Sequence, residues 1–296
     1  MRVLVTGATG FIGRHLVAQL AARDHEVIST GRGTQGPREA VRHVPHDIGN
    51  PAPFPEVGRL DAIVHLAGRS SVQDAIDDPM GVAQTNAQGT LHALLLVRKY
   101  GAHFILASSQ LTYQRGPRPR TERSPQLPSD LYGYTKLIAE RYLEMAGRLF
   151  GVTGAILRFF SVYGPGQLVT RGTSGVVSIF AQRALAGEPI RILSHERRDF
   201  VAVDDAVEAI IAALSAARCP PSAYNIGTGV GTSIDDLARR ICAITGSASP
   251  ILEGSSSQHP GDLVANITRA RRELGYAPGI TLNEGLQAYV DWLRSI

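Results

Sequence analysis

The chain of 296 residues predicts an α/β protein with a doubly wound parallel sheet and a smaller C-terminal part. Three observations predict this class. A short apolar run at the N-terminus leads through closely spaced glycines into a helical pattern. Further strand-like segments then alternate with helical patterns, as in sheets that carry helices on both faces. From about 160 to 198 and from about 228 to 278, Gly, Pro and Ser become more frequent, which predicts a less regular part.

The first predicted element is a buried strand around Val3 to Val5. It is followed by Gly7, Gly10 and Gly13, spaced Gly-x-x-Gly-x-x-Gly, and by apolar residues at helical spacing. Such glycines let the backbone turn tightly and approach a pyrophosphate, which then lies on the N–H groups of the helix N-terminus. Their place between a strand and a helix predicts a Rossmann-type dinucleotide site, although the spacing is not the more common Gly-x-Gly-x-x-Gly.

The next predicted strand runs from Glu26 to Thr30 and should end beside the adenosine ribose of a dinucleotide. A site for NAD usually has an acid there, which binds the ribose 2′-hydroxyl. Here Gly31 and Arg32 follow the strand, and a guanidinium suits a 2′-phosphate. The strand end therefore predicts NADP(H), with NAD as the alternative.

Further strands are predicted near Arg42, Ile63, Phe104 and Ala155, and helices near residues 16, 94, 137 and 209. We expect residues 1–159 to form the NADP(H)-binding domain, completed by segments near 200–227. Residues 160–199 and 228–296 are expected to form most of a substrate-binding domain. The Pro- and Arg-rich segment 114–130 predicts a mobile loop beside the active site.

Tyr132 and Lys136 indicate the chemistry. Lys136 is one of only two lysines in the chain, and on a helix the i, i+4 spacing puts it on the same face as Tyr132. A neighbouring ammonium can lower the pKa of a phenol from its ordinary value of about 10. A tyrosine with a lowered pKa can transfer a proton near neutral pH.

With these features the chain resembles the extended short-chain dehydrogenase/reductase family, the nucleotide-sugar epimerases, dehydratases and reductases. The resemblance runs nearly from end to end, and the order and spacing of its sequence blocks are specific. The blocks are Thr6-Gly-Ala-Thr-Gly-Phe-Ile-Gly13, His46-Asp-Ile48, His65-Leu-Ala-Gly68, Asn86-Ala-Gln-Gly-Thr90, Ala107-Ser-Ser-Gln-Leu-Thr-Tyr113, Tyr132-Gly-Tyr-Thr-Lys136, Leu157-Arg-Phe-Phe-Ser-Val-Tyr-Gly-Pro-Gly166, Arg198-Asp-Phe-Val201, Asp204-Asp205, Tyr224-Asn-Ile-Gly-Thr-Gly229 and Pro260-Gly-Asp262.

The resemblance implies roles for individual residues. Tyr132 is expected to be the acid/base, Lys136 to bind the nicotinamide ribose and Ser109 to hydrogen-bond the reacting sugar oxygen; Ser108 is expected to lie over the cofactor or to cap the strand end. The residues expected at the cofactor are Gly7, Thr9, Gly10, Phe11, Ile12, Gly13, Arg32, Asp47, Ile48, Leu66, Ala67, Gly68, Tyr132, Lys136 and Phe159. Those expected at the substrate are Gln110, Ser161, Arg198 and His259, with Ser161 and His259 departing from the usual Asn and Arg of the family.

Gln110 and Leu111, the two residues after Ser109, narrow the reaction. Family dehydratases and decarboxylases have an acid at one or both places, and 3,5-epimerizing reductases have a cysteine at the second. Because Gln110 and Leu111 are neither acids nor cysteines, the family reaction that remains is hydride transfer at a carbinol or ketone carbon. Because Arg32 favours NADPH, we predict a nucleotide-sugar 4-ketoreductase, with a 4-epimerase acting through a transient ketone as the alternative. A non-catalytic dinucleotide sensor is a further alternative, which the combination of Ser109, Tyr132 and Lys136 disfavours.

Composition restricts the other function classes. Cys219 and Cys242 are too few for a disulfide framework, and no Cys/His cluster has metal-ligand spacing, so we expect reduced cysteines and no metal. The net charge of +4 is spread along the chain without a basic, aromatic stripe, which disfavours nucleic acid. We find no apolar run of membrane-spanning length and no leader, and therefore expect a cytoplasmic protein. Apolar residues around 91–97 and 137–145 predict a homodimer, since the family pairs these helices across a dimer axis.

Overall fold

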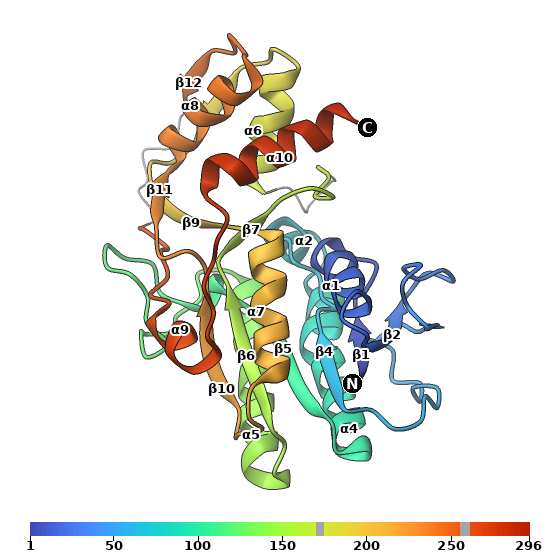
Figure 1. Ribbon diagram of the computed structural model, residues 1–296. Coiled ribbons are helices and arrows are strands. Elements are labelled where there is room, and N and C mark those ends of the chain that lie inside the picture. The colour runs from blue at the N-terminus through green and yellow to red at the C-terminus, as the bar shows by residue number, and fades with distance from the viewer. Residues whose placement is uncertain (170–174, 255–260) are drawn as a thin grey trace.

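The computed structural model describes residues 1–169, 175–254 and 261–296. Its centre is a seven-stranded parallel sheet in the order β10-β6-β5-β4-β1-β2-β3 (Figure 1). The strands of this sheet are β1 (Arg2–Thr6), β2 (Glu26–Gly31), β3 (Arg42–Pro45), β4 (Ala62–His65), β5 (His103–Ser109), β6 (Gly154–Phe159) and β10 (Ser222–Ile226). The predicted doubly wound α/β fold is confirmed, and the strand order reverses between β1 and β4, where such folds bind their ligands.

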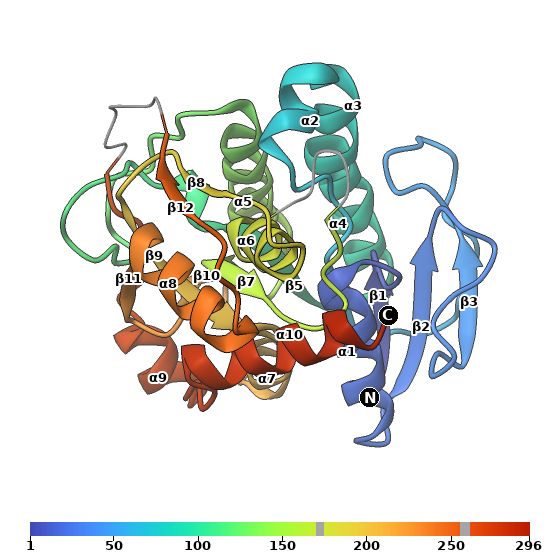
Figure 2. The same cartoon turned by 90° about the horizontal axis from the view of Figure 1, so that it is seen from above.

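Helices cover both faces of the sheet (Figure 2). The helices α1 (Phe11–Ala21) and α7 (Val203–Ser215) pack on one face, and α4 (Gly89–Tyr100) and α5 (Leu131–Phe150) pack on the other. Each face has its own apolar core. Because the central strands are buried on both sides, they read as continuous apolar runs and not as alternating patterns.

A smaller cap lies over the carboxyl edge of the sheet (Figure 1). We expected its segments 160–198 and 228–278 to be rich in loops, but α6 and α8 of these segments, together with α10, which we did not predict, pack around a third apolar core. The three helices have 10 to 13 residues, and the Gly-, Pro- and Ser-rich residues around α6 and α8 concealed these two in the sequence. The elements of this part are β7 (Ser161–Tyr163), α6 (Val176–Leu185), β8 (Ile190–Ile192), β9 (Arg197–Ala202), β11 (Gly231–Ser233), α8 (Ile234–Thr245), β12 (Ile251–Glu253) and α10 (Leu282–Arg294). The helix α9 (Thr268–Leu274) lies between them in the chain but packs against β10 and α7 of the main sheet.

The buried carboxylate of Asp199 fixes β9 in this cap. It accepts hydrogen bonds from the backbone N–H groups of Thr228 at 2.7 Å, Gly229 at 2.8 Å and Ala265 at 3.2 Å. Burial raises the pKa of Asp199 in spite of these bonds. Since the three donors come from two distant parts of the chain, one side chain determines where the neighbouring Arg198 lies.

A buried ion pair joins the strand β6 of the main sheet to α5. Arg158 of β6 donates to Glu140 of α5, with Nε at 2.9 Å from Oε1 and Nη2 at 2.6 Å from Oε2. Arg158 Nη1 also donates to the Tyr113 hydroxyl at 2.7 Å, and Ser108 Oγ donates to Glu140. The pair is almost free of solvent, so each charge depends on the other.

The segment 114–130 contains no helix or strand, as expected, but the protein holds it in place. Arg120 N donates to Val264 O at 2.7 Å, and Asn266 N donates to Arg120 O at 2.8 Å. The Glu122 carbonyl accepts from Arg158 Nη1, and Gln126 Nε2 donates to Glu140. Its ties to the buried charges argue against the mobility that we predicted from its composition.

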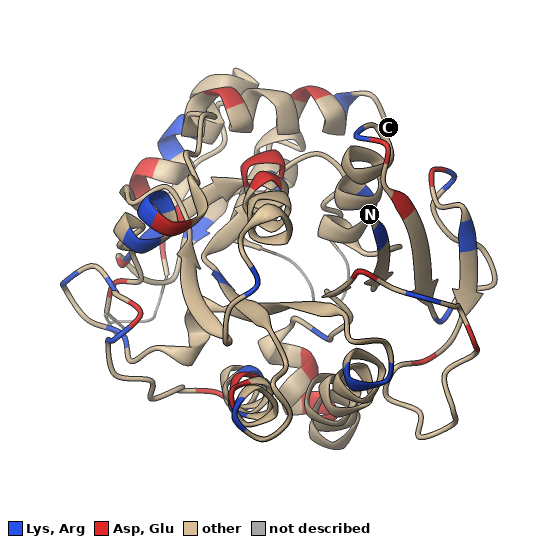
Figure 3. Ribbon diagram, turned by 60° about the horizontal axis from the view of Figure 1, so that its bottom comes forward, with Lys and Arg blue, Asp and Glu red and all other residues tan. Residues whose placement is uncertain are grey.

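Charged residues lie mainly on the outer elements. In the view of Figure 3, Lys and Arg are intermixed with Asp and Glu over the helices and loops, and the middle of the sheet is largely free of both. In the part of the chain that the structure describes, we find no helix long and apolar enough to cross a membrane.

The Glu140–Arg158 pair leads to a stability prediction. Arg158→Met leaves Glu140 buried without its partner, and we expect a loss of about 3–5 kcal/mol in the free energy of unfolding, measured by urea denaturation. Arg148→Met, which removes an arginine that is 80% exposed and lies 3.9 Å from Glu144 on the same helix, should cost less than about 1 kcal/mol. Equal losses in the two variants would contradict a special role for the buried pair.

Candidate active site

The glycine turn between β1 and α1 is shaped by close packing. Gly7 has φ +68°, and a Cβ there would lie 2.7 Å from the backbone N of Ala67. A Cβ on Gly13 would lie 2.2 Å from Gly7 O. Around Gly10, in contrast, only Gly7 O lies within 4 Å of such an atom, and no side chain caps the start of α1. The turn therefore leaves the helix N-terminus open to an anion, as dinucleotide binding requires.

Beside this turn lies a cavity of about 200 Å³ at the carboxyl ends of β1, β2 and β4. Nine of the residues predicted for the cofactor line it: Gly7, Thr9, Gly10, Arg32, Asp47, Ile48, Leu66, Ala67 and Gly68. Gly31, on which the cofactor prediction also depends, is in this wall. Sequence reasoning missed other residues of the wall, namely Thr6, Thr30, His46, Arg69 and Thr85. The residues present fit the adenosine end of a dinucleotide, because backbone and small side chains enclose the space next to a helix N-terminus.

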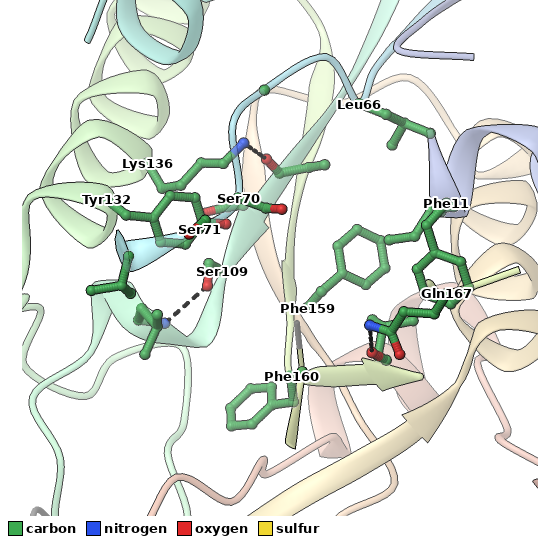
Figure 4. Close-up of a pocket in the computed structure, with 18 of the residues that line it drawn as sticks. Phe11, Leu66, Ser70, Ser71, Ser109, Tyr132, Lys136, Phe159, Phe160 and Gln167 are labelled. Carbon is green, nitrogen blue, oxygen red and sulfur yellow. Dashed lines mark hydrogen bonds between the residues drawn. The ribbon is translucent and has the colours of Figure 1, made fainter. Parts of the chain in front are cut away.

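Leu66 and Gly68 also line a second, larger cavity of about 610 Å³ (Figure 4). The predicted residues in its wall are Phe11, Ile12, Leu66, Gly68, Ser109, Tyr132, Lys136, Phe159 and Arg198. Ser108, which we expected over the cofactor or at the strand end, is also in this wall. The residues that sequence reasoning did not assign to the site are Ser70, Ser71, Val72, Gln73, Ala107, Leu111, Phe160, Val162, Gln167 and Gly175. The sheet and the cap thus both contribute to one wall.

The start of α5 places Tyr132 in this cavity. Asp130 caps the helix by accepting the N–H of Gly133 at 2.8 Å. A Cβ on Gly133 would lie 2.3 Å from Leu111 O, so the glycine lets α5 approach the turn that follows Ser109. Tyr132 consequently lies beside Ser109, and both side chains are seen in the cavity in Figure 4.

Lys136 lies one helical turn further along α5. Its Nζ donates to the carbonyl of Ala107 at 3.0 Å. A Cβ on Gly68 would be 3.2 Å from that Nζ, so only a small residue leaves room for the ammonium. Burial lowers the pKa of Lys136 to about 8, against the opposing effect of Glu140.

Tyr132 differs from expectation in its acidity. Burial raises the pKa of Tyr132 to about 12, and the Ser109 hydroxyl only partly opposes this. The Lys136 ammonium, whose Nζ donates to Ala107 O, is not among the causes of the shift. We predicted that Lys136 lowers this pKa. In the protein without a dinucleotide this is wrong, because burial of the phenol raises its pKa more than neighbouring groups lower it. The protein alone holds Tyr132 in its protonated form.

The two neighbouring serines are separated by the alternation of β5. Ser109 Oγ accepts the N–H of Leu111 at 3.1 Å and lies at the cavity. The Ser108 hydroxyl instead donates to Glu140, in the buried charge network. Ser108 also lies in the wall of the larger cavity, so its expected place over the cofactor stays a prediction, while its hydroxyl binds α5.

The four residues predicted for the substrate have different positions. Arg198 lines the large cavity. Gln110 and Ser161 contact each other, with Gln110 Nε2 donating to Ser161 Oγ at 3.0 Å, but neither is in the cavity wall. Gln110 Oε1 is buried and has no hydrogen-bond partner among the described residues. His259 lies outside the described residues.

Asn86 is a positioning residue that sequence reasoning left without a role. It lies in a short π-helical turn, η1 (Gln84–Gln88), and its side chain accepts from Arg69 N at 2.8 Å and donates to Thr135 Oγ1 at 3.0 Å. It thereby links the loop after β4 to α5 between Tyr132 and Lys136. Its place in the block Asn86-Ala-Gln-Gly-Thr90 was the available sign of this role.

A group with metal-ligand chemistry lies in the cap, where the spacing along the chain does not reveal it. His195, Asp235 and Glu253 come within 4.8 Å of one another. His195 Nδ1 is 2.9 Å from Asp235 Oδ2, and Nε2 is 3.2 Å from Glu253 Oε2. Asp235, and then Glu253, raise the pKa of His195. The two carboxylates therefore favour the protonated form of this histidine.

The fold and the two joined cavities define a dinucleotide-dependent enzyme of the extended short-chain dehydrogenase/reductase type. Comparison with known proteins agrees: the model of the NAD dependent epimerase/dehydratase family matches residues 3–227. The chain belongs to this family.

Several relatives match over their whole length. The UDP-glucose 4-epimerase of Mycolicibacterium smegmatis is 33% identical over 321 aligned residues, which cover 100% of this chain and 99% of that protein. The structure of UDP-glucose 4-epimerase from Thermotoga maritima with UDP-glucose has a TM-score of 0.89 and 31% identity, covering 100% of this chain and 99% of the other. The enzyme of Thermus thermophilus, solved with NAD, has a TM-score of 0.88 and 30% identity, covering 99% of each chain.

The geometry predicts an order of effects on turnover. Tyr132→Phe removes the only phenol in the described cavity wall and should lower turnover by roughly two to four powers of ten with dinucleotide binding kept. Lys136→Ala should weaken dinucleotide binding as well. Ser109→Ala should have the mildest effect, since it removes one hydrogen bond and leaves the proton donor.

Steady-state kinetics and cofactor titration of the three variants measure this order, with circular dichroism to verify folding. Near-normal turnover in folded Tyr132→Phe would mean that another group transfers the proton.

Proposed function

We propose that the protein is a nucleotide-sugar 4-epimerase that acts through a transient 4-keto sugar. The observation that carries this proposal is the cavity wall itself: Ser109, Tyr132 and Lys136 come together, and Leu111 stands where an additional acid or thiol would be needed for other family reactions. The similarity to UDP-glucose 4-epimerases over the whole chain supports the same reaction. It supports the epimerase more strongly than the 4-ketoreductase that we favoured from the sequence.

Tyr132 is the proposed acid/base. It accepts the proton of the sugar 4-hydroxyl in the oxidation and returns it to the ketone oxygen in the reduction. Ser109 hydrogen-bonds the same oxygen and keeps it near the phenol. A bound dinucleotide supplies the hydride acceptor and donor and, in its oxidised form, a positive charge. Since burial holds the pKa of Tyr132 near 12, the tyrosine needs that added charge to become an acceptor.

A nucleotide-activated sugar fits the larger cavity. Arg198 offers a cation at one side of the cavity, and Tyr132 lies in the same wall, so an anionic carrier and a reacting sugar can be held at once. A 4-epimerase must also let the ketone present its other face while the carrier stays bound. Ser70, Ser71 and Gly175 make part of the wall small, which favours such a movement.

The product assay distinguishes the three functions. We expect UDP-, TDP- or GDP-hexoses to give the 4-epimer without net change in nicotinamide absorbance. Deuterium at C4 should be retained in the product, because the same hydride returns to the same carbon. Consumption of one NADPH per 4-keto sugar would instead establish the ketoreductase, and bound dinucleotide without any turnover would establish the sensor.

For the cofactor, we propose that the end of β2 accepts the 2′-phosphate of NADP(H). The support is Arg32 in the wall of the adenosine-sized cavity, with glycine where NAD sites usually have an acid. The similar Thermus enzyme was solved with NAD, so NAD is the alternative.

Arg32→Ala should weaken NADPH binding about ten- to a hundred-fold through loss of a charge-assisted contact, and should change NADH binding little. Arg38→Ala, which removes another exposed arginine of the segment after β2, serves as the control. Fluorescence titration measures both ligands. Equal affinity of the unaltered protein for NADPH and NADH would contradict the proposal.

We also propose a homodimer through α4 and α5, which pack side by side. Both helices expose large apolar side chains: Leu91 and Leu95 on α4, and Tyr134, Ile138, Met145 and Leu149 on α5. A surface of this kind is costly in water unless a partner covers it. Pairing these faces across a two-fold axis gives a four-helix bundle.

Sedimentation at micromolar concentration should give twice the mass of one chain. Leu95→Glu should shift the protein to monomer, because it puts a charge into the proposed interface, whereas Leu193→Glu on the cap should not. A monomeric unaltered protein would exclude the dimer.

A further inference from the structure

Arg115, which neither the sequence analysis nor the proposed function uses, is an arginine whose side chain has no partner in the described part of the chain. It follows Tyr113 and Gln114 in the loop between β5 and α5 and is only partly exposed. Among the described residues, no hydrogen bond or ion pair involves its side chain, and Nη1 is shielded from solvent. An arginine held away from water without a partner is costly, so its position calls for an explanation.

Arg115 is not part of the wall of the larger cavity, but charged groups near that wall act on it. Burial, and next the charge of Arg198, lower the pKa of Arg115, while Glu196 and Asp130 oppose this. Arg198 lines the cavity, and Asp130 caps the helix on which Tyr132 follows two residues later. Arg115 is therefore close to both sides of the proposed substrate site.

The backbone around Arg115 is fixed. Gly116 N donates to Asp262 O at 3.2 Å, and a Cβ on Gly261 would lie 3.1 Å from the Cβ of Arg115. Asp262 Oδ1 in turn accepts the backbone N–H of Arg197 at 2.8 Å. Through residues 261 and 262, these contacts tie the backbone of the segment with Arg115 to the strand with Arg198.

Protein groups neutralise only one of the two cations directly. Arg198 donates through Nε and Nη2 to Oε1 of Glu196, a fully buried carboxylate. Arg115 shares no such contact. Two guanidinium groups held near each other repel unless an anion lies between them, and the planar fork of arginine suits phosphate oxygens.

We propose that Arg115 and Arg198 together bind the diphosphate of the nucleotide-activated substrate, with Arg115 as the second phosphate-binding cation. The inference rests on the proposed function for the identity of the ligand. It assigns a residue of the irregular loop to substrate binding, and it explains why the protein holds this loop so firmly.

Calorimetric titration with UDP, TDP, GDP and inorganic pyrophosphate tests the inference without turnover. We expect Arg115→Gln to lower the affinity for the diphosphate that binds best by about ten- to a hundred-fold. The affinity for the corresponding nucleoside and for NADH should stay within two-fold. The matched control is Arg118→Gln, which removes the same charge from an exposed position of the same loop and should leave all affinities unchanged.

Thermal unfolding of the ligand-free protein separates binding from a structural role. Arg115→Gln removes an unpaired, partly buried cation, so the midpoint should stay or rise. A lowered midpoint with unchanged diphosphate affinity would overturn the inference, as would equal affinities in the Arg115→Gln and Arg118→Gln proteins. A protein that binds none of the four probes would also overturn it. If Arg115→Gln weakens diphosphate binding but no nucleotide sugar is epimerized, the binding site stands and the proposed reaction fails.

Discussion

The buried ion pair of Glu140 and Arg158 is the interaction on which the site most depends. It lies beneath the ends of β5 and β6, and through Ser108, Tyr113 and Gln126 it reaches β5 and both ends of the irregular segment 114–130. Such a pair contributes little net stability compared with apolar packing, yet its two charges tolerate only one arrangement. The positions of Ser109, at the end of β5, and of Tyr132, on α5, follow from that arrangement. The positions of the side chains in the cavity are thus determined by a buried ion pair that does not itself line the cavity.

Burial governs the acid/base behaviour of the cavity in two opposite ways. It raises the pKa of Tyr132 and lowers that of Lys136, so both groups are shifted toward their neutral forms. Without another charge nearby, Tyr132 therefore keeps its proton, and Lys136 loses its proton more readily than a lysine in water. A positively charged ring beside Tyr132 would reverse the first tendency. Proton transfer in this site is consequently coupled to the redox state of whatever dinucleotide it binds.

Much of the fold could be predicted from the sequence because the relevant patterns are local. The glycines after β1, the apolar strands and the Tyr132–Lys136 spacing each lie within a few residues, and the structure agrees with them. Two helices of the cap, α6 and α8, were missed because the Gly-, Pro- and Ser-rich residues around them are typical of loops, although α8 and α10 are amphipathic helices of ordinary length. Asn86 comes to the site only through contacts between distant segments. The pKa of Tyr132 was misjudged because burial, which sequence spacing does not report, exceeds the effect of a neighbouring charge.

The three glycines of the turn are required for two different reasons, the packing of the protein itself and the binding of a ligand. A side chain on Gly7 or Gly13 would collide with backbone atoms of the protein itself, whereas a methyl group on Gly10 would meet only one atom nearby. Tolerance to mutation should therefore differ within one short motif. Variants selected for folding alone would keep Gly7 and Gly13 and accept small residues at position 10. Variants selected for catalytic activity would keep all three glycines. The difference between the two selections at position 10 would therefore show the requirement that dinucleotide binding places on the turn.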